Sequence, residues 1–354
     1  MANRYREMKK FLLVAVALLL LASSVPALTK AINVTYNTTN YRLGRFAVDL
    51  PRGSQVSVAG QYHGADVVDD ADIRDFDALK NKLDPFAEQY LQTKMQHNLD
   101  TDELFKATGL DPAKEFGNSQ LVTYQAYPER GEILFGYHPT ATDATITIHL
   151  YKVSPEGSVT FAQTDRAIDN LAVDAAALQR MASSFKMYRI GEKVPAGAFC
   201  LKQGCVDDHG AQPVNEQASL RGTLGGHEDA KISILTLARV TAAMKGSDLE
   251  HEADNQIQEF SECGAHVTVL RRGQRSIAGQ SGFEVAISCT SNDNLVRPAF
   301  IFAWVAAGKV QDANKPMIHF NLRIQPTSNG LSTVSTPEEA LKLWDTSLNS
   351  LAPT

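Results

Sequence analysis

The stretch Val267-Thr-Val-Leu-Arg-Arg-Gly-Gln-Arg-Ser-Ile-Ala-Gly-Gln-Ser-Gly-Phe-Glu-Val-Ala-Ile-Ser-Cys289 gives the clearest indication of the fold. Val267 and Val269 are β-branched, and Val285 and Ile287 alternate with small residues at a period of two, which is typical of strands. Between the two runs, Arg271, Arg272 and Arg275 cluster around Gly273, and Gly279 and Gly282 are positions where the backbone can turn with positive φ. The stretch therefore predicts a β-hairpin with a basic, solvated tip.

In the second half of the chain, apolar periodicity predicts further strands on both sides of this hairpin, and two helices. The strands are expected at 199–201, 217–224, 231–238, 297–306 and 317–325, with a helical segment within about 240–260. A final helix begins at Thr336-Pro-Glu-Glu339, where a capping box coincides with a proline at the first helical position.

The first half repeats this plan. Strands are predicted at 43–51, 55–58, 121–127, 133–137 and 144–153. One helix is predicted over about 75–94, and a second one begins with Thr164 as its N-cap and ends near Phe185. Each half of the sequence thus contains several strands and ends with a helix. This pattern indicates an α+β protein of two domains, each a mainly antiparallel sheet packed with helices and closed by a C-terminal helix.

The segment 191–197 is the best linker candidate, because it contains Gly191, Pro195 and Gly197. A chain of 354 residues has room for two domains, which typically hold about 100–200 residues each. We therefore expect an N-terminal α+β domain at 41–190 and a C-terminal α+β domain at 191–354.

The N-terminus indicates export. Lys9 and Lys10 lead into the apolar run Phe11–Ala22, which is shorter than the roughly 20 residues that a membrane-spanning helix needs. Small residues follow, with Val25 and Ala27 at the −3 and −1 positions of a cleavage site. We predict a signal peptide at 1–27, no stable membrane insertion after cleavage, and a flexible lead-in at 28–40. An uncleaved anchor is the alternative.

Charge excludes one class of partner. The whole chain has a formal net charge of −6, and without residues 1–27 it has 30 basic and 39 acidic residues, hence −9. Neutralising phosphates requires a basic face, so nucleic acid is not expected to be a partner.

Four cysteines, Cys200, Cys205, Cys263 and Cys289, lie in the second half. An even number in an exported protein indicates disulfides, and four cysteines allow three connectivities, among which the sequence does not choose. The two local pairs, Cys200 with Cys205 and Cys263 with Cys289, are favoured. A zinc site is the competing interpretation, but the spacings lack a CxxC pair.

No catalytic, cofactor-binding or metal-ligating residues are predicted. Ser281 comes near the nucleophile elbow of hydrolases, but Phe283 stands where that pattern needs glycine. The nine histidines show neither HExxH nor i,i+4 ligand spacing, and no phosphate-binding glycine loop is present.

The acidic run at 66–72 contains three candidate partner-binding residues, Asp66, Asp69 and Asp70. The run lacks the alternating ligands and the glycine of a calcium loop, so it is interpreted as a solvated acidic turn. Its functional interpretation is a charged surface that speeds association with a basic protein.

Three segments of the second half resemble a known family: Gly197-Ala-Phe-Cys-Leu201, the strand around 230–237, and Leu270–Glu284. They are similar to the C-terminal domain of the two-domain periplasmic immunity proteins that neutralise phospholipase effectors (the fourth lipase class) of the bacterial type VI secretion system. Gly44–Pro51 resembles the opening strand of their N-terminal domain.

The resemblance implies an exported, periplasmic protein of a Gram-negative bacterium. It implies inhibition by binding, with a cognate lipase effector as partner and without enzyme activity or cofactor. The alternatives are a periplasmic small-molecule-binding or envelope protein, which would need a closed apolar pocket, and a hydrolase whose site is assembled between the domains.

Overall fold

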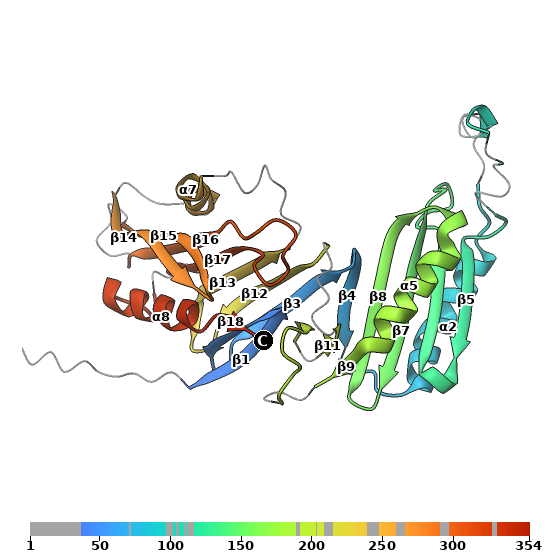
Figure 1. The fold of residues 1–354 in the computed structure, drawn as a ribbon, viewed down its shortest axis with the longest axis horizontal. Helices are drawn as coiled ribbons and strands as arrows, with labels where there is room; N and C mark the ends of the chain where they lie inside the picture. The colour runs from blue at the N-terminus through green and yellow to red at the C-terminus, as the bar shows by residue number, and fades with distance from the viewer. Residues whose placement is uncertain are drawn as a thin grey trace, which may run out of the picture. The chain divides into compact units, whose positions relative to one another are not determined.

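The computed structural model describes residues 37–70, 72–96, 102–103, 106–109, 111, 117–188, 192–202, 204–208, 215–238, 248–259, 266–290, 297–327 and 331–354. The predicted signal peptide, most of the predicted lead-in, and Cys263 lie outside these residues. The described residues form two mainly antiparallel sheets with helices packed on them, so the predicted α+β class is confirmed (Figure 1).

The larger sheet has twelve strands, and all of its strand pairs are antiparallel. In spatial order they are β14 (His266–Ile277), β15 (Gln280–Thr290), β16 (Ala299–Ala306), β17 (Met317–Ile324), β13 (His227–Leu237), β12 (Gln217–Leu224), β3 (Gln55–Tyr62), β4 (Ala65–Asp70), β8 (Gly157–Arg166), β7 (Ile146–Ser154), β6 (Glu132–Tyr137) and β5 (Leu121–Tyr127).

The smaller sheet joins segments from the beginning, the middle and the end of the chain. Its order is β18 (Ala352–Pro353), β2 (Phe46–Pro51), β1 (Thr38–Gly44), β10 (Phe199–Leu201), β11 (Gly204–Val206) and β9 (Phe185–Met187). β1 and β2 form a hairpin that turns at Gly44 and Arg45, whereas the sequence predicted one strand over 43–51. Gly44 has a φ of 60°, which glycine adopts without strain.

Strand pairing connects the two halves of the chain. β3 pairs with β12 from Gln55 to Gln61, so one sheet contains strands from both halves. β2 also pairs with β18 at the C-terminus. The division into domains at 41–190 and 191–354 stays a prediction, and β1 begins at Thr38, inside the predicted lead-in.

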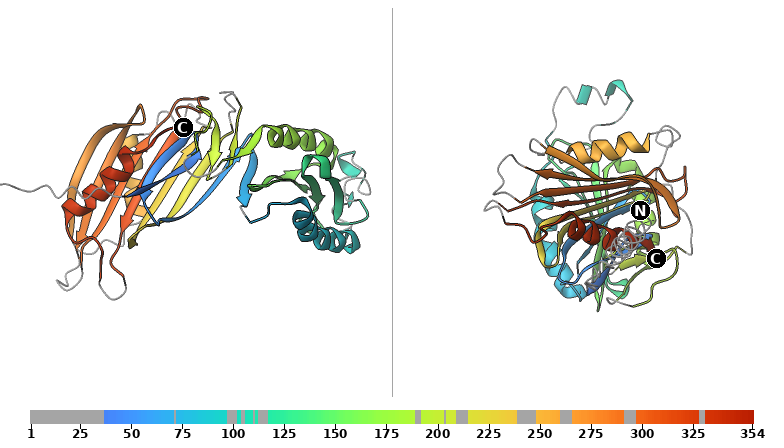
Figure 2. Two further views of the ribbon diagram at one scale, coloured as in Figure 1. Left: turned by 90° about the horizontal axis from the view of Figure 1, so that it is seen from below. Right: turned by 90° about the vertical axis from the view of Figure 1, so that its left-hand side faces the viewer.

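In the described part of the chain, four helices pack on the larger sheet: α2 (Phe76–Gln92), α5 (Leu171–Ser184), α7 (Leu249–Glu259) and α8 (Pro337–Asn349). α2 and α5 cover opposite faces of the β5–β8 region (Figure 2). Leu79 and Leu83 of α2 pack against Ile133 of β6. Asp75 caps α2 by accepting a hydrogen bond from the backbone N–H of Ala78, as the predicted start near residue 75 requires.

The β14–β17 region is covered in the same way by α7 and α8 (Figure 1). The indole of Trp344 in α8 packs against Phe302 and Phe320, with ring centroids 5.3 and 5.4 Å apart. Burial of each such side chain contributes about 1.5–3 kcal/mol. The capping box of Thr336 and Glu339 that starts α8 is present as predicted.

The helix predicted to start at Thr164 begins later. Thr164 lies within β8, which pairs with β7 as far as Arg166. A 3-10 turn at Ile168–Asn170 follows, and α5 starts at Leu171. The local capping signal was overridden by pairing of β8 with β7 in a hairpin, which satisfies the backbone groups of this segment.

The opening hairpin forms, and its turn is at Ala278 and Gly279, one of the two glycines predicted to allow a turn, whereas Gly273 and the basic cluster around it lie within β14. Both turn residues have positive φ, 52° and 72°, as two-residue type I′ turns require. The arginines lie within β14 and are not a solvated tip. Arg271 and Arg275 bind the carboxylate of Glu284, which is 2% exposed (Nη1–Oε1 3.2 and 2.7 Å). Ion pairs thus fasten this strand to its neighbour.

The same arginines bind the helices. Arg271 donates to Asp345 of α8, and Arg272 donates to Glu250 and Asp254 of α7. The arginines of β14 therefore form ion pairs that hold α7 and α8 against the sheet.

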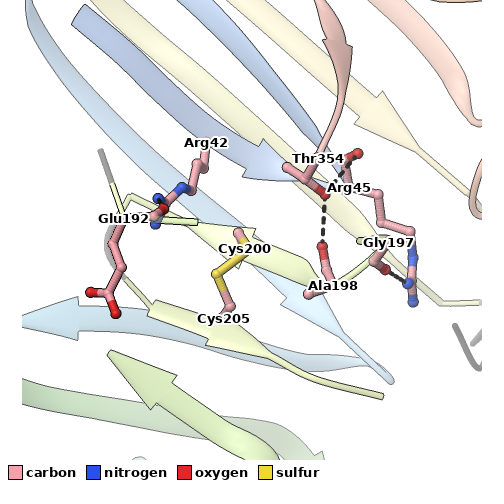
Figure 3. The surroundings of a disulfide bond; sticks show 8 residues. All are labelled: Arg42, Arg45, Glu192, Gly197, Ala198, Cys200, Cys205 and Thr354. Atoms are coloured by element: carbon pink, nitrogen blue, oxygen red, sulfur yellow. Dashed lines mark hydrogen bonds between the residues drawn. A yellow bond between two sulfur atoms is a disulfide. The ribbon is translucent and has the colours of Figure 1, made fainter. Parts of the chain in front are cut away.

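A disulfide joins Cys200 and Cys205, which are directly opposed in β10 and β11 (Figure 3). The C-terminal residue lies beside it, since Thr354 Oγ1 donates to the carbonyl oxygens of Ala198 and Arg45. Cys289 is also disulfide-bonded, and Cys263 lies outside the described residues.

Candidate partner-binding surface

The acidic segment predicted as a turn is strand β4, which lies between β3 and β8. Asp66 pairs with Gln61 and Ala162, and its Oδ1 accepts a hydrogen bond of 2.7 Å from Gln61 Nε2. Asp69 is three residues later, so it points to the opposite face of the strand. The side chain of Asp70 lies outside the described residues. The structure therefore does not bring the acidic side chains of Asp66 and Asp69 to one surface.

Four aromatic rings form a row on the face that Asp66 shares. The strand register places Asp66, Ala162 and His149 side by side on β4, β8 and β7. The row consists of Tyr90 of α2, Tyr137 of β6, and His149 and Tyr151 of β7, and we call it the aromatic row.

The rings of the aromatic row stack nearly parallel. Centroid distances are 4.6 Å between Tyr90 and Tyr137, 5.6 Å between Tyr137 and His149, and 5.6 Å between His149 and Tyr151. The imidazole also hydrogen-bonds both neighbours, since Nε2 is 3.3 Å from Tyr137 Oη and Nδ1 is 3.5 Å from Tyr151 Oη. Such contacts hold the rings in fixed orientations, which lowers the entropy cost of presenting them to a partner.

The aromatic row is uncharged at neutral pH. Burial lowers the pKa of His149 to about 4, while the nearby carboxylate of Asp66 acts in the opposite direction. Burial also raises the pKa of Tyr151 to about 12. The row is therefore a set of neutral, half-buried rings with one carboxylate beside it.

Exposed apolar side chains adjoin the aromatic row. Val68 of β4 is 57% exposed and lies in register with Thr160 and Tyr151, on the same face. Phe86 of α2 is 50% exposed and lies one helical turn before Tyr90. We call Asp66, Val68, Phe86 and the aromatic row together the aromatic face. Aromatic residues are enriched at the core of protein–protein interfaces, whereas charged residues such as aspartate are found at the rim.

Asp66 was predicted from the sequence as a partner-binding residue, but the aromatic rings beside it were not. The available signal was aromatic residues at a period of two, Phe135 with Tyr137 and His149 with Tyr151, on two predicted strands. Only the register between these strands and the position of α2 make them one surface.

In the residues that the structure describes, no three His, Cys, Asp or Glu side chains are grouped so that they could hold a metal ion. None of the helices in this described part has the length and apolar character that crossing a membrane requires.

Known proteins similar to this chain are immunity proteins. Residues 194–353 match the family model described as the Tle cognate immunity protein 4 C-terminal domain. The fold is similar to the apo structure of the immunity protein TplEi of the type VI secretion system from Pseudomonas aeruginosa, at 16% identity and a TM-score of 0.69, over 89% of this chain and 97% of that one. No curated protein matches.

Two further structures carry the same fold. A chain of the Tle4–Tli4 complex is similar at 15% identity and a TM-score of 0.69, over 89% of this chain and 97% of that one. TplEi complexed with "L" peptide is similar at 16% identity and a TM-score of 0.62, over 89% and 98%. The resemblance indicated by the sequence is thus confirmed: residues 194–353 match the Tle cognate immunity protein 4 C-terminal domain, and the chain has the fold of the TplEi structure and of a chain of the Tle4–Tli4 complex.

Proposed function

We propose that this chain is a periplasmic immunity protein that binds and inhibits a type VI secretion lipase or phospholipase effector. It protects the producing cell from its own effector and from that of sister cells. The family match over 194–353 and the complex between Tle4 and Tli4 support this function. The predicted signal peptide at 1–27 supports the periplasmic location.

The aromatic face is the observation that carries the proposal. Val68 and Phe86 are large, exposed and apolar, and they flank rings that are already held in place. Burying such groups against a partner provides most of the binding free energy of an interface, while a carboxylate such as Asp66 favours a basic partner and speeds association. We propose that this face contacts the effector.

Inhibition by binding requires no catalytic group, and we propose that the chain is not an enzyme and uses no cofactor. The alternative, a small-molecule-binding protein, is not favoured by the cavities. The two described cavities hold about 320 and 260 Å³, both open to solvent, and their walls include Arg180, Lys152 and Glu156. A small-molecule site is more enclosed and mostly apolar.

The test is to mix the mature chain, residues 28–354, with the lipase encoded beside it and to measure complex formation and phospholipase activity together. We expect a one-to-one complex in which activity is abolished. A lipase from an unrelated effector class is the matched control. Absence of a complex, or full lipase activity within the complex, contradicts the proposal.

A further inference from the structure

A cavity of about 320 Å³ lies where the turn between β3 and β4 meets α5, on the side of the sheet opposite α2. Its wall is made by Tyr62, His63, Gln163, Ala177, Arg180, Met181 and Ser184. Polar and apolar side chains share this wall. The cavity is separate from the aromatic face and has no part in the effector contact proposed there.

Arg180 is an unpaired cation at this cavity. It is exposed, and among the described residues its guanidinium has no ion pair and no hydrogen-bond acceptor. By contrast, Arg166, just before α5, binds the Asp174 carboxylate through two hydrogen bonds of 2.8 Å. In a chain with 40 acidic residues, an arginine left without a carboxylate at a cavity rim is available to an external anion.

His63 adds a second nitrogen-bearing group. It lies with Gly64 in the two-residue turn between β3 and β4, and both have positive φ, 51° and 78°. Asparagine, aspartate or glycine usually occupies this position, because they adopt positive φ at low cost. Here the turn instead places an imidazole at the cavity, packed edge-on against the Tyr62 ring at 4.7 Å.

The cavity wall also contains a hydrogen-bond acceptor that no donor of the described residues reaches. Gln163 Oε1 is buried and has no hydrogen-bond partner in the described part of the chain. A buried acceptor is stabilised when a ligand brings an N–H group within reach of the rotatable amide. Ala177 and Met181 supply apolar contact between the amide and the cation.

One carboxylate bonded to the cavity wall already has partners inside the protein. The Tyr62 hydroxyl donates a hydrogen bond of 2.9 Å to Asp208, and the same carboxylate is bound by Arg45 (Nη2–Oδ2 2.5 Å), which Asp208 shares with Glu216. Arg180 and His63 are the nitrogen-bearing side chains of the wall that a ligand carboxylate would contact.

We propose that this cavity is a docking site for an acidic side chain of the bound effector. Arg180 and His63 bind the carboxylate, Met181 and Ala177 contact its methylene groups, and the backbone N–H of the same residue pairs with Gln163. This inference rests on the proposed function, because the acidic side chain comes from the inhibited lipase. The docked carboxylate gives the effector a second, polar contact that fixes its orientation. This contact lies on the face of the sheet opposite the aromatic face.

The first test compares the affinity of the mature chain and its variants for the lipase. Arg180→Gln weakens binding at least tenfold, Arg180→Glu weakens it further by repulsion, and Arg180→Lys recovers part of the loss. Arg52→Gln is the matched control, because Arg52 is another exposed arginine and lies beyond the opposite end of β3 from Tyr62. Wild-type affinity in both Arg180→Gln and Arg180→Glu overturns the proposal.

The second test does not use the lipase. N-acetyl-glutamate α-amide is titrated into the mature chain while the methyl resonance of Met181 is followed by NMR, with N-acetyl-glutamine α-amide as the neutral control probe. We expect a saturable shift with the acidic probe that disappears in Arg180→Gln and persists in Arg52→Gln.

The two tests separate the possible failures. If the wild-type chain binds no lipase, the proposed function fails, and the probe titration alone decides whether the cavity binds carboxylates. If the lipase binds but Arg180 variants leave its affinity unchanged, docking through this cavity is overturned even where the free probe binds. Absence of any Arg180-dependent shift overturns the carboxylate site itself.

Discussion

Arg45 donates hydrogen bonds to both carboxylate oxygens of Glu216, a residue 171 positions later in the chain (Nε–Oε2 2.9 Å, Nη2–Oε1 2.6 Å). Both side chains are buried, and Asp208 binds the same guanidinium. Two carboxylates thus share one buried cation next to the start of β12. The contact joins the turn of the β1–β2 hairpin to the larger sheet, so its charge state affects how firmly the two sheets are held together.

Glu216 predicts one pH dependence. Burial raises its pKa to about 7 from the ordinary 4.5, so the folded chain holds a proton there that the unfolded chain releases. Stability from this group is fully present below pH 4.5 and is lost as the pH rises through 7. We expect the midpoint of thermal unfolding to fall between pH 5.5 and 8, and to fall less in Glu216→Gln. Glu228→Gln, at an exposed position of β13, is the control; an equal slope in Glu216→Gln and the wild type contradicts the prediction.

His149 predicts the opposite dependence at lower pH. Because burial lowers its pKa to about 4 from 6.5, the unfolded chain binds a proton there that the folded chain does not. The neutral imidazole contributes at most about 3 kcal/mol to the free energy of unfolding. This contribution is fully present above pH 6.5 and is lost as the pH falls through 4. Urea unfolding of wild type and His149→Gln at pH 7, 5.5 and 4 measures this. The exposed His251→Gln is expected to behave as wild type, and parallel curves for wild type and His149→Gln argue against a buried neutral imidazole.

The aromatic face predicts where substitutions affect inhibition. Val68→Arg or Phe86→Ser removes an exposed apolar group that only a partner would cover, so we expect at least about tenfold weaker lipase binding with little change in thermal stability. Val267→Arg is the matched control, because Val267 is 55% exposed on β14, the edge strand of the larger sheet opposite β5 and away from α2 and α5. Isothermal titration with the lipase separates the variants. Equal affinities for Val68→Arg and Val267→Arg would remove the aromatic face from the interface.

The Cys200–Cys205 disulfide predicts a loss of stability on its removal. It closes a short loop, with a sequence separation of 5, and both residues are fully buried. Restricting a loop of this length in the unfolded chain stabilises the fold by about 2 kcal/mol. Urea unfolding of the double variant Cys200→Ala/Cys205→Ala is expected to show that loss, and an unchanged midpoint speaks against a structural role.

Local signals predicted the elements whose hydrogen bonds are made within a few residues. Asp75 caps α2, and Thr336, Pro337 and Glu339 start α8, because each of these interactions is complete within one helical turn. The opening hairpin was also predicted from its two alternating strands. Gly279 was predicted as a turn position, but the solvated basic tip around Gly273 was wrong, because basic residues usually indicate solvent, whereas Arg271 and Arg275 here bind the buried Glu284.

Strand pairing explains what the sequence did not predict. The run at 66–72 is acidic enough to be taken for a turn, yet its first five residues, Asp66 to Asp70, belong to β4, which pairs with β3 and β8. Thr164 is a suitable N-cap in isolation, yet it lies in β8. In both places, strand pairing satisfies the backbone groups: β4 pairs with its hairpin neighbour β3 and with the distant β8, and β8 pairs near Thr164 with its hairpin neighbour β7.

The sequence by itself determined the α+β class, the repeated plan of strands closed by a helix, and the resemblance to immunity proteins, because these depend on periodicity and on short motifs. The tertiary structure alone decided which side chains share a surface. The aromatic row combines rings from three elements: Tyr90, Tyr137, His149 and Tyr151. Arg180 and His63, which are far apart in the first half of the sequence, line the same cavity. Their proximity depends on strand register and helix placement, which are set by the summed burial of the whole core rather than by any local segment.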